Sequence, residues 1–271
     1  MKPCRAEGAA ERQTMSGHNK WSTIKHKKGA ADAKRGKIFS RIAKEMTIVA
    51  KSGGGDPGSN PTLRTLIAKA KACNMPNDNI DRAIKKGTGE LESDILEEIT
   101  YEGYAQGGVG LVVKVLTDNK NRAAAEVRNI FKKSGSDFAG LGSVSRGFER
   151  KGTIMVPAAE GLTEDGLMEV VLSSGADDMV AEEGGFTVTC QPVAFSEVCA
   201  ALEAAGIKID PENSQVGLVP ITPVPVNELA VAKAVNKFVA ALEDHDDVQD
   251  VYTNMEIADE IAEKLQAEEE A

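Results

Sequence analysis

Aromatic side chains are scarce in this chain: tryptophan, tyrosine and phenylalanine make up 4% of the sequence, with a single tryptophan. A surface that stacks many nucleic-acid bases therefore has few side chains to draw on. No apolar run approaches the roughly 18 residues that a membrane-spanning helix needs. Residues 1–14 have no apolar segment and carry two glutamates, unlike a signal or transit peptide. We therefore expect a cytoplasmic protein without a membrane anchor.

Cysteine and histidine are also few and widely spaced. The cysteines form no Cys-x-x-Cys pair, and neither residue type has the spacing of a metal site. Reduced, mostly buried thiols are the expectation. The residues concerned are Cys4, Cys73, Cys190, Cys199, His18, His26 and His245.

Motifs of catalysis and of nucleotide binding are missing as well. Six residues separate Gly29 from Gly36, and Ile38 follows Lys37, whereas a phosphate-binding P-loop needs four residues there and a serine or threonine after the lysine. We expect no catalytic residue, no metal, no cofactor and no small-molecule substrate. An enzyme that uses a cleft between domains is the remaining alternative.

Charge is distributed unevenly along the chain, although the net charge of −10 hides this. Residues 1–90 contain 19 lysines and arginines against 8 aspartates and glutamates, while the rest contains 13 against 34. The acidic part is repelled by phosphate, so it orients the basic end toward a polyanion. The asymmetry therefore predicts binding to nucleic acid through the N-terminal part.

The basic charge is concentrated between Met15 and Lys51, which hold ten basic and two acidic residues. A basic arm precedes a helix predicted at 30–51, in which Ile38, Ile42 and Met46 form an apolar stripe beside a basic face. Lysines neutralise phosphates, and a tryptophan can stack on a base or pack in the protein. The candidate nucleic-acid-binding residues are Lys20, Trp21, Lys25, His26, Lys27, Lys28, Lys34, Arg35, Lys37, Arg41 and Lys44.

Two further helices complete the predicted N-terminal unit. Asn60-Pro61 is a typical helix start, because asparagine caps and proline at the first helical position loses no needed N–H. Pro76 begins the next helix, which we expect to stop at Gly87. Residues 1–14 are expected to be a disordered extension. Residues 15–92 are then a basic helical domain.

The remainder alternates predicted strands and helices in two βαββαβ-like units. Strands or extended chain are expected at 207–210 and 215–219. Residues 147–216 hold one complete set, and 93–146 plus 217–254 close around it as a discontinuous domain; two tandem units are the alternative. Residues 255–271 are expected to be an acidic tail. The fold class is α+β multidomain, with an all-α three-helix domain followed by two ferredoxin-like α/β domains.

Glu243-Asp-His-Asp-Asp247 is the densest run of carboxylates outside the C-terminal tail. Such runs are usually solvated loops, and a divalent-ion site is the alternative here. We expect the loop.

Several segments resemble the YebC/PmpR family: Met15-Ser-Gly-His-Asn-Lys-Trp-Ser-Thr-Ile-Lys-His-Lys-Lys, Asp32-Ala-Lys-Arg-Gly-Lys-Ile-Phe, Gly53-Gly-Gly-Asp-Pro, Asn74-Met-Pro-Asn-Asp-Asn-Ile-Asp-Arg-Ala-Ile-Lys-Lys-Gly, Tyr101-Glu-Gly-Tyr, Thr117-Asp-Asn-Lys-Asn-Arg-Ala-Ala-Ala-Glu-Val-Arg and Ala241-Leu-Glu-Asp. The resemblance spans Met15 to about Asn254. Met15 resembles the family's usual start, which implies that residues 1–14 are an extension or the product of a misassigned start codon. It implies three domains around a cleft and a non-enzymatic cytoplasmic regulator, usually described as a probable DNA-binding transcriptional regulator.

The same resemblance implies an alternative, because mitochondrial relatives are similar to translational activators and some bacterial members are implicated in relieving ribosomes stalled at proline runs. In that case the lysines grip ribosomal RNA, and the turn at Asn74 to Asn79 becomes a candidate functional loop. Arg146-Gly147 departs from the family, which usually has a bulky apolar or aromatic pair there. Nucleic acid, either duplex DNA or ribosomal RNA, is the predicted partner.

Overall fold

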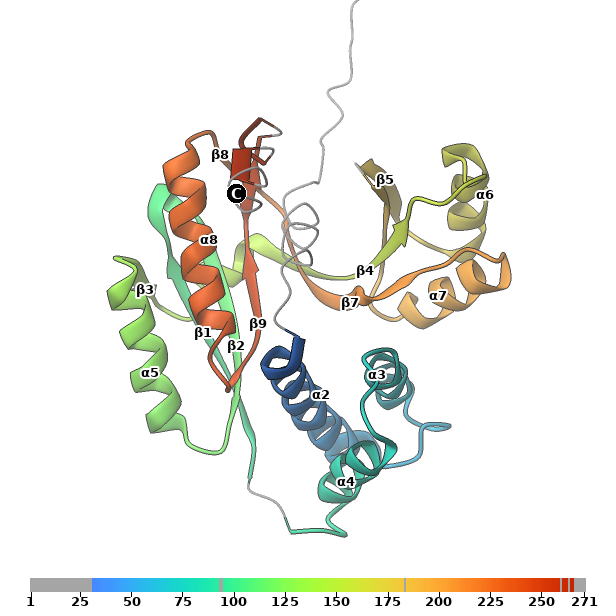
Figure 1. Cartoon of the computed structure of the whole chain (residues 1–271), viewed down its shortest axis with the longest axis horizontal. Coiled ribbons are helices and arrows are strands. Elements are labelled where there is room, and N and C mark those ends of the chain that lie inside the picture. The colour runs from blue at the N-terminus through green and yellow to red at the C-terminus, as the bar shows by residue number, and fades with distance from the viewer. Residues whose placement is uncertain (1–30, 93–94, 183, 259, 263, 266–271) are drawn as a thin grey trace, which may run out of the picture.

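The computed structural model describes residues 31–92, 95–182, 184–258, 260–262 and 264–265, without the side chains of residues 31–35, 182 and 212. It consists of a helical N-terminal unit and two four-stranded antiparallel sheets that carry helices (Figure 1). The predicted α+β multidomain class is confirmed.

The helical unit contains α2 (Ala31–Gly53), α3 (Pro61–Ala72) and α4 (Asn77–Thr88), close to the predicted ranges. Asn60 begins α3 as expected: its Oδ1 accepts a hydrogen bond from Leu63 N at 3.1 Å. Its Nδ2 donates to the carbonyl oxygens of Val49 at 3.1 Å and Gly54 at 3.0 Å. One side chain thus caps α3 and ties it to the end of α2.

Gly87 does not end α4, which corrects the predicted stop. The helix continues to Thr88, and Gly89 caps it in the left-handed conformation with φ 83°. Gly87 is buried against α2, where a Cβ would lie 2.4 Å from the carbonyl oxygen of Thr47 and 2.7 Å from the Cβ of Ala50. Glycine is required here for close packing of two helices.

The first sheet has the strand order β3-β1-β2-β9, and α5 (Lys120–Lys133) and α8 (Leu229–Glu243) cover one of its faces (Figure 1). β1 and β2 form an antiparallel hairpin, and their inward residues form a core with Phe131 and Phe238. β9 pairs with β2 although more than a hundred residues separate them. The strands are β1 (Glu97–Tyr104), β2 (Gly110–Thr117), β3 (Asp137–Ala139) and β9 (Val248–Thr253).

The second sheet has the order β5-β6-β4-β7, with α6 (Glu164–Ser174) and α7 (Phe195–Ala204) packed on it. Its chain order is the predicted βαββαβ. The strands are β4 (Phe148–Pro157), β5 (Asp178–Glu182), β6 (Gly185–Cys190) and β7 (Asp210–Pro220). In the first sheet the hairpin comes first and the helix-linked strands follow, so its chain order differs while its layering is similar.

The second sheet is formed by chain that runs between β3 and β9 of the first. We retain the division into 93–146 plus 217–254 and 147–216 as a proposal. The predicted strand at 215–219 lies within β7, which begins at Asp210, whereas residues 207–209 lie outside any strand. The register of β7 shifts opposite Thr153 and Met155, where Ser214 Oγ accepts a hydrogen bond from Met155 N at 3.0 Å.

The expected acidic tail is wrong for its first residues. β10 (Met255–Ile257) pairs in parallel with β8 (Val224–Val226), and Ile261, Ala262 and Leu265 are buried in the first core. Apolar residues among the glutamates of this segment give it a buried side that the overall charge conceals.

The two sheets meet through their other faces. Val112 of β2 and Tyr252 of β9 pack with Phe148 of β4 and Leu218 of β7. Glu102, 1% exposed, fixes the connection between the sheets: it accepts hydrogen bonds from the backbone of Gly142, Val144 and Ser145 at 2.6 to 3.0 Å.

Candidate nucleic-acid interface

α2 has the two faces that its sequence predicts. Ile42 and Met46, 3% and 0% exposed, face the helical core. Lys37, Arg41 and Lys44 follow one another at spacings of four and three residues, which places them on one side of the helix.

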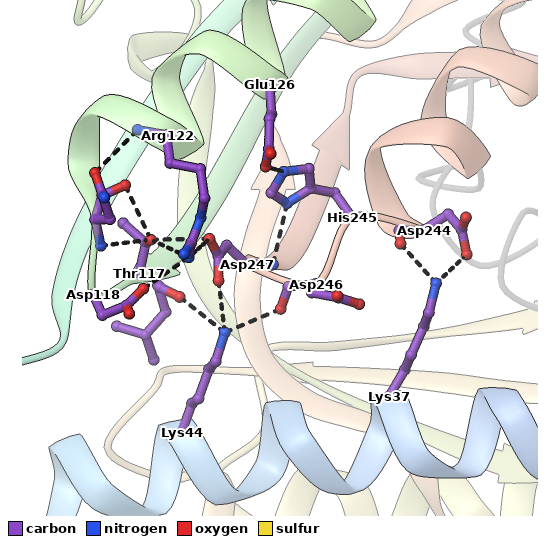
Figure 2. A network of polar contacts seen from close by, with 12 residues as sticks. Lys37, Lys44, Thr117, Asp118, Arg122, Glu126, Asp244, His245, Asp246 and Asp247 are labelled. Carbon is purple, nitrogen blue, oxygen red and sulfur yellow. Dashed lines mark hydrogen bonds and ion pairs between the residues drawn. The ribbon is translucent and has the colours of Figure 1, made fainter. Parts of the chain in front are cut away.

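The basic side of α2 contacts the acidic run between α8 and β9, as Figure 2 shows for Lys37 and Lys44. Lys37 Nζ lies 2.5 Å from Asp244 Oδ1 and donates to the carbonyl oxygen of Asp244 at 2.8 Å. Arg41 donates to the carbonyl oxygen of Glu243. Lys44 Nζ lies 2.8 Å from Asp247 Oδ1 and 3.1 Å from the Asp246 carbonyl oxygen.

Asp247 is the buried centre of this network, with a side chain 7% exposed. Its Oδ2 accepts hydrogen bonds from Thr117 Oγ1 and from Arg122 Nη2, each at 2.9 Å. Burial raises the pKa of this carboxyl, but the hydrogen bonds from Lys44, Arg122 and Thr117 outweigh burial and bring the pKa to about 2. Asp247 is therefore a permanent anion that joins α2 to the first sheet.

His245 fixes the loop from its other side. Its Nδ1 accepts a hydrogen bond from Asp247 N at 3.1 Å, and its Nε2 lies 2.7 Å from Glu126 Oε2 on α5. An Nδ1 that accepts leaves the proton on Nε2, which then donates to Glu126. The acidic run is thus a loop held in place by His245 and the buried Asp247, while Asp244 and Asp246 remain exposed as expected of a solvated loop. Among the described residues, no group of three or more His, Cys, Asp or Glu side chains could hold a metal ion.

A second charged cluster lies where α2 meets β9. Burial raises the pKa of Glu45 to about 7, and the charge of Asp250 adds to this shift, while Lys69, Arg41 and Lys114 oppose it. Asp250 is also hydrogen-bonded to Tyr252, whose pKa is raised well above its ordinary value by burial first and by Asp250 second. The contact between the helical unit and the first sheet therefore contains a carboxyl that titrates near neutrality.

Part of the candidate site lies beyond what the structure describes. Lys20, Trp21, Lys25, His26, Lys27 and Lys28 fall outside the described residues, and Lys34 and Arg35 lie in α2 with undescribed side chains. The three remaining candidates, Lys37, Arg41 and Lys44, come together as predicted but face the protein's own acidic loop. Their role in binding nucleic acid stays a prediction.

The cations of α4 are not among the candidate residues predicted from the sequence. Arg82, Lys85 and Lys86 are exposed, and none of them forms an ion pair within the described part of the chain. The sequence pattern that indicates these cations is Asp81-Arg-Ala-Ile-Lys-Lys. Its basic residues lie beside the apolar stripe formed by Ile80, Ala83 and Ile84.

Comparisons with known proteins divide the chain between the helical unit and the first sheet. Residues 19–90 match the family description "TACO1/YebC protein N-terminal domain", and residues 96–255 match "TACO1/YebC second and third domain". The chain belongs to the TACO1/YebC family. The resemblance found in the sequence is thereby confirmed, and the division between the two matches falls between α4 and β1.

Curated members of the TACO1/YebC family share about half of their residues with this chain. A protein of Treponema denticola is 53% identical over 243 residues, covering 90% of this chain and 97% of its own length. One of Opitutus terrae is 49% identical over 247 residues, covering 91% and 98%. Each of the two is named a probable transcriptional regulatory protein.

A crystal structure of a conserved hypothetical protein from Aquifex aeolicus has the same fold. It is 45% identical, with a TM-score of 0.79, and the alignment covers 88% of this chain and 97% of that one.

No helix in the described ranges combines the length and apolarity that crossing a membrane requires.

Proposed function

We propose that this protein is a cytoplasmic, non-enzymatic regulator of gene expression that binds nucleic acid, with duplex DNA as the first candidate. The separation of charge carries the proposal: a basic helical unit with its arm is joined to an acidic remainder. The names of the curated relatives, probable transcriptional regulatory proteins, support the same function.

In this proposal the arm and the start of α2 neutralise phosphates, through Lys20, Lys25, Lys27, Lys28, Lys34 and Arg35. Phosphate contacts give affinity with little sequence readout. Neutralising six to eight phosphates corresponds to a slope of log K against log salt of roughly −5 to −7.

The test measures the affinity for a labelled DNA duplex by fluorescence anisotropy at salt concentrations between roughly 50 and 300 mM. We expect the triple change Lys25→Glu, Lys27→Glu and Lys28→Glu to abolish the salt-sensitive complex. Lys132→Glu, Lys133→Glu and Lys237→Glu, three exposed lysines on α5 and α8, change the net charge equally and should retain most of the binding. The absence of any salt-sensitive complex for the unchanged protein contradicts the DNA proposal.

A ribosome-bound translation factor is the second candidate, and the position of α2 favours it. Lys37, Arg41 and Lys44 contact the acidic loop, so this side of α2 is not free to enter a major groove as a recognition helix. Cations distributed over several elements suit recognition of RNA by shape and backbone.

Sedimentation with ribosomes separates the two candidates. Cosedimentation that is lost in the Lys25, Lys27 and Lys28 variant, together with weak duplex binding, favours the translation factor. If these charge reversals leave both ribosome and DNA binding intact, the basic arm is the wrong site.

A further inference from the structure

A cavity of about 320 Å³ lies between α2 and α4. The two helices touch where Gly87 meets Thr47 and Ala50, and Thr47 Oγ1 donates to the Ala83 carbonyl oxygen at 3.1 Å. The cavity is lined by residues between 39 and 47 of α2 and between 79 and 86 of α4. Its volume is at the lower end of the roughly 300–1,000 Å³ of small-ligand pockets.

The cavity wall is largely apolar and includes an aromatic ring. Phe39 and Ala43 contribute from α2, one turn apart, and Ala83 contributes from α4. Met75, 5% exposed, closes the cavity because Asn74, with φ 58°, turns the chain directly before it. Asn79 supplies an amide that can donate and accept hydrogen bonds. This wall suits a flat, mostly apolar group with polar edges.

The cavity rim is cationic. Arg82 and Lys86 line it from α4, four residues apart and therefore on one face, and both are exposed. Lys44 lines it from α2 but is already bound to Asp247. Among the residues that the structure describes, no carboxylate lines the cavity. Arg82 and Lys86 are therefore available to an anion next to the apolar wall.

The geometry points to a pocket for one unpaired nucleotide of a single-stranded nucleic acid. The base lies against Phe39 with its edge at Asn79, and the flanking phosphates bind Arg82 and Lys86. This inference rests on the proposed nucleic-acid binding and locates a second contact surface, on α4, apart from the basic arm. A base within a duplex cannot enter without being unpaired, so single strands are the preferred ligand.

The experiment measures anisotropy of three fluorescein-labelled probes: a 12-nucleotide oligouridylate, the matching oligothymidylate and a DNA duplex. The rim variant carries Arg82→Ala and Lys86→Ala, and its control carries Lys85→Ala and Lys71→Ala, which remove two exposed cations outside the cavity. Loss of two phosphate contacts should reduce the magnitude of the salt slope by about 1.4 for a single strand. The control variant keeps Arg82 and Lys86, so it should keep the part of the salt slope that their two phosphate contacts contribute.

A blocking variant tests the pocket without removing charge. Ser40 lines the cavity and is exposed, so Ser40→Trp should cover the mouth without disturbing the core. Ser52→Trp, at the exposed end of the same helix, is the matched control. Since stacking of a base is worth a factor of roughly 5 to 150, we expect single strands to bind the Ser40→Trp variant at least about fivefold more weakly.

The outcomes are distinct. Affinities of the rim and blocking variants within twofold of the unchanged protein overturn the pocket, while binding by the arm stands. Equal losses in the pocket variants and their controls also overturn it. An unchanged protein that binds none of the three probes contradicts the proposed function itself. If the rim and blocking variants lose affinity only for the oligouridylate, the pocket binds RNA. If they lose affinity equally for both single strands, the pocket accepts either nucleic acid.

Discussion

Gly87 and Asp247 are two residues whose importance depends on what lies opposite them. Gly87 is within van der Waals reach of the α2 backbone, and Asp247 is a buried anion with three donors. Both positions lie far in sequence from the residues that give them their roles.

Gly87→Ala should destabilise the helical unit by about 1 to 3 kcal/mol, because the added methyl group would overlap Thr47 O and Ala50 Cβ. Gly36→Ala is the control: Gly36 is exposed in α2 with no atom within 4 Å of an added Cβ. Alanine there should stabilise by about 0.5 to 1 kcal/mol, since glycine is the poorer helix former. Thermal unfolding followed by circular dichroism checks both, and equal effects would contradict the close contact.

Asp247→Asn should cost about 2 kcal/mol at pH 7, because the carboxylate is held at a pKa of about 2 by Lys44, Arg122 and Thr117. A depressed pKa contributes stability that is present above the unfolded-state value near 4 and is lost as the pH falls through about 2. The difference between the two proteins should therefore narrow from pH 4 to pH 2. Urea unfolding across this range measures it, with the exposed Asp118→Asn as comparison. A constant difference would show that Asp247 acts through packing alone.

At the scale of elements, α2 is held between two surfaces of opposite character. Its apolar side packs against α3 and α4, and its polar side contacts the loop after α8 and the strand β9. A helix in this position cannot expose a continuous basic face, although its sequence has one.

Glu45→Gln should stabilise the contact between α2 and β9 above neutral pH. The folded-state pKa of Glu45, about 7, exceeds its ordinary value of 4.5, so the stability it contributes is present below about pH 4.5 and is lost as the pH rises through 7. We expect the variant to exceed the unchanged protein by on the order of 2 kcal/mol at pH 8 and to match it at about pH 4, below the ordinary pKa of 4.5. Unfolding midpoints at the two pH values test this, and parallel pH profiles would contradict it.

At the scale of the whole molecule, the basic unit folds back onto the acidic part of its own chain. Nucleic acid that used Lys37, Arg41 and Lys44 would have to displace Glu243, Asp244 and Asp247 first. The protein's own carboxylates therefore compete with phosphates for this side of α2.

Asp244→Asn tests that competition. Asp244 is 80% exposed and pairs with Lys37, so its removal should cost little stability. If Lys37 takes part in binding, affinity for nucleic acid should rise about two- to fivefold at low salt, since an exposed pair is worth about 0 to 1 kcal/mol. Asp165→Asn, an exposed carboxylate on α6, gives the same change in net charge and should have a smaller effect. Equal effects of the two changes would exclude Lys37 from the interface.

Local patterns were sufficient to predict the helices, the alternation of strands and helices in the α/β part, the family and the charge asymmetry, because periodicity, capping residues and composition belong to short segments. The helix start at Asn60-Pro61, for example, depends only on neighbouring residues. The contacts of the charged side chains became apparent only in the folded structure. Lys37 and Lys44, which the sequence predicts to lie on a free basic face, contact Asp244 and Asp247 some two hundred residues away. Gly87 reads as a helix stop until Thr47 is placed opposite it. Contacts between distant segments depend on how helices and sheets pack, and no local pattern contains that information.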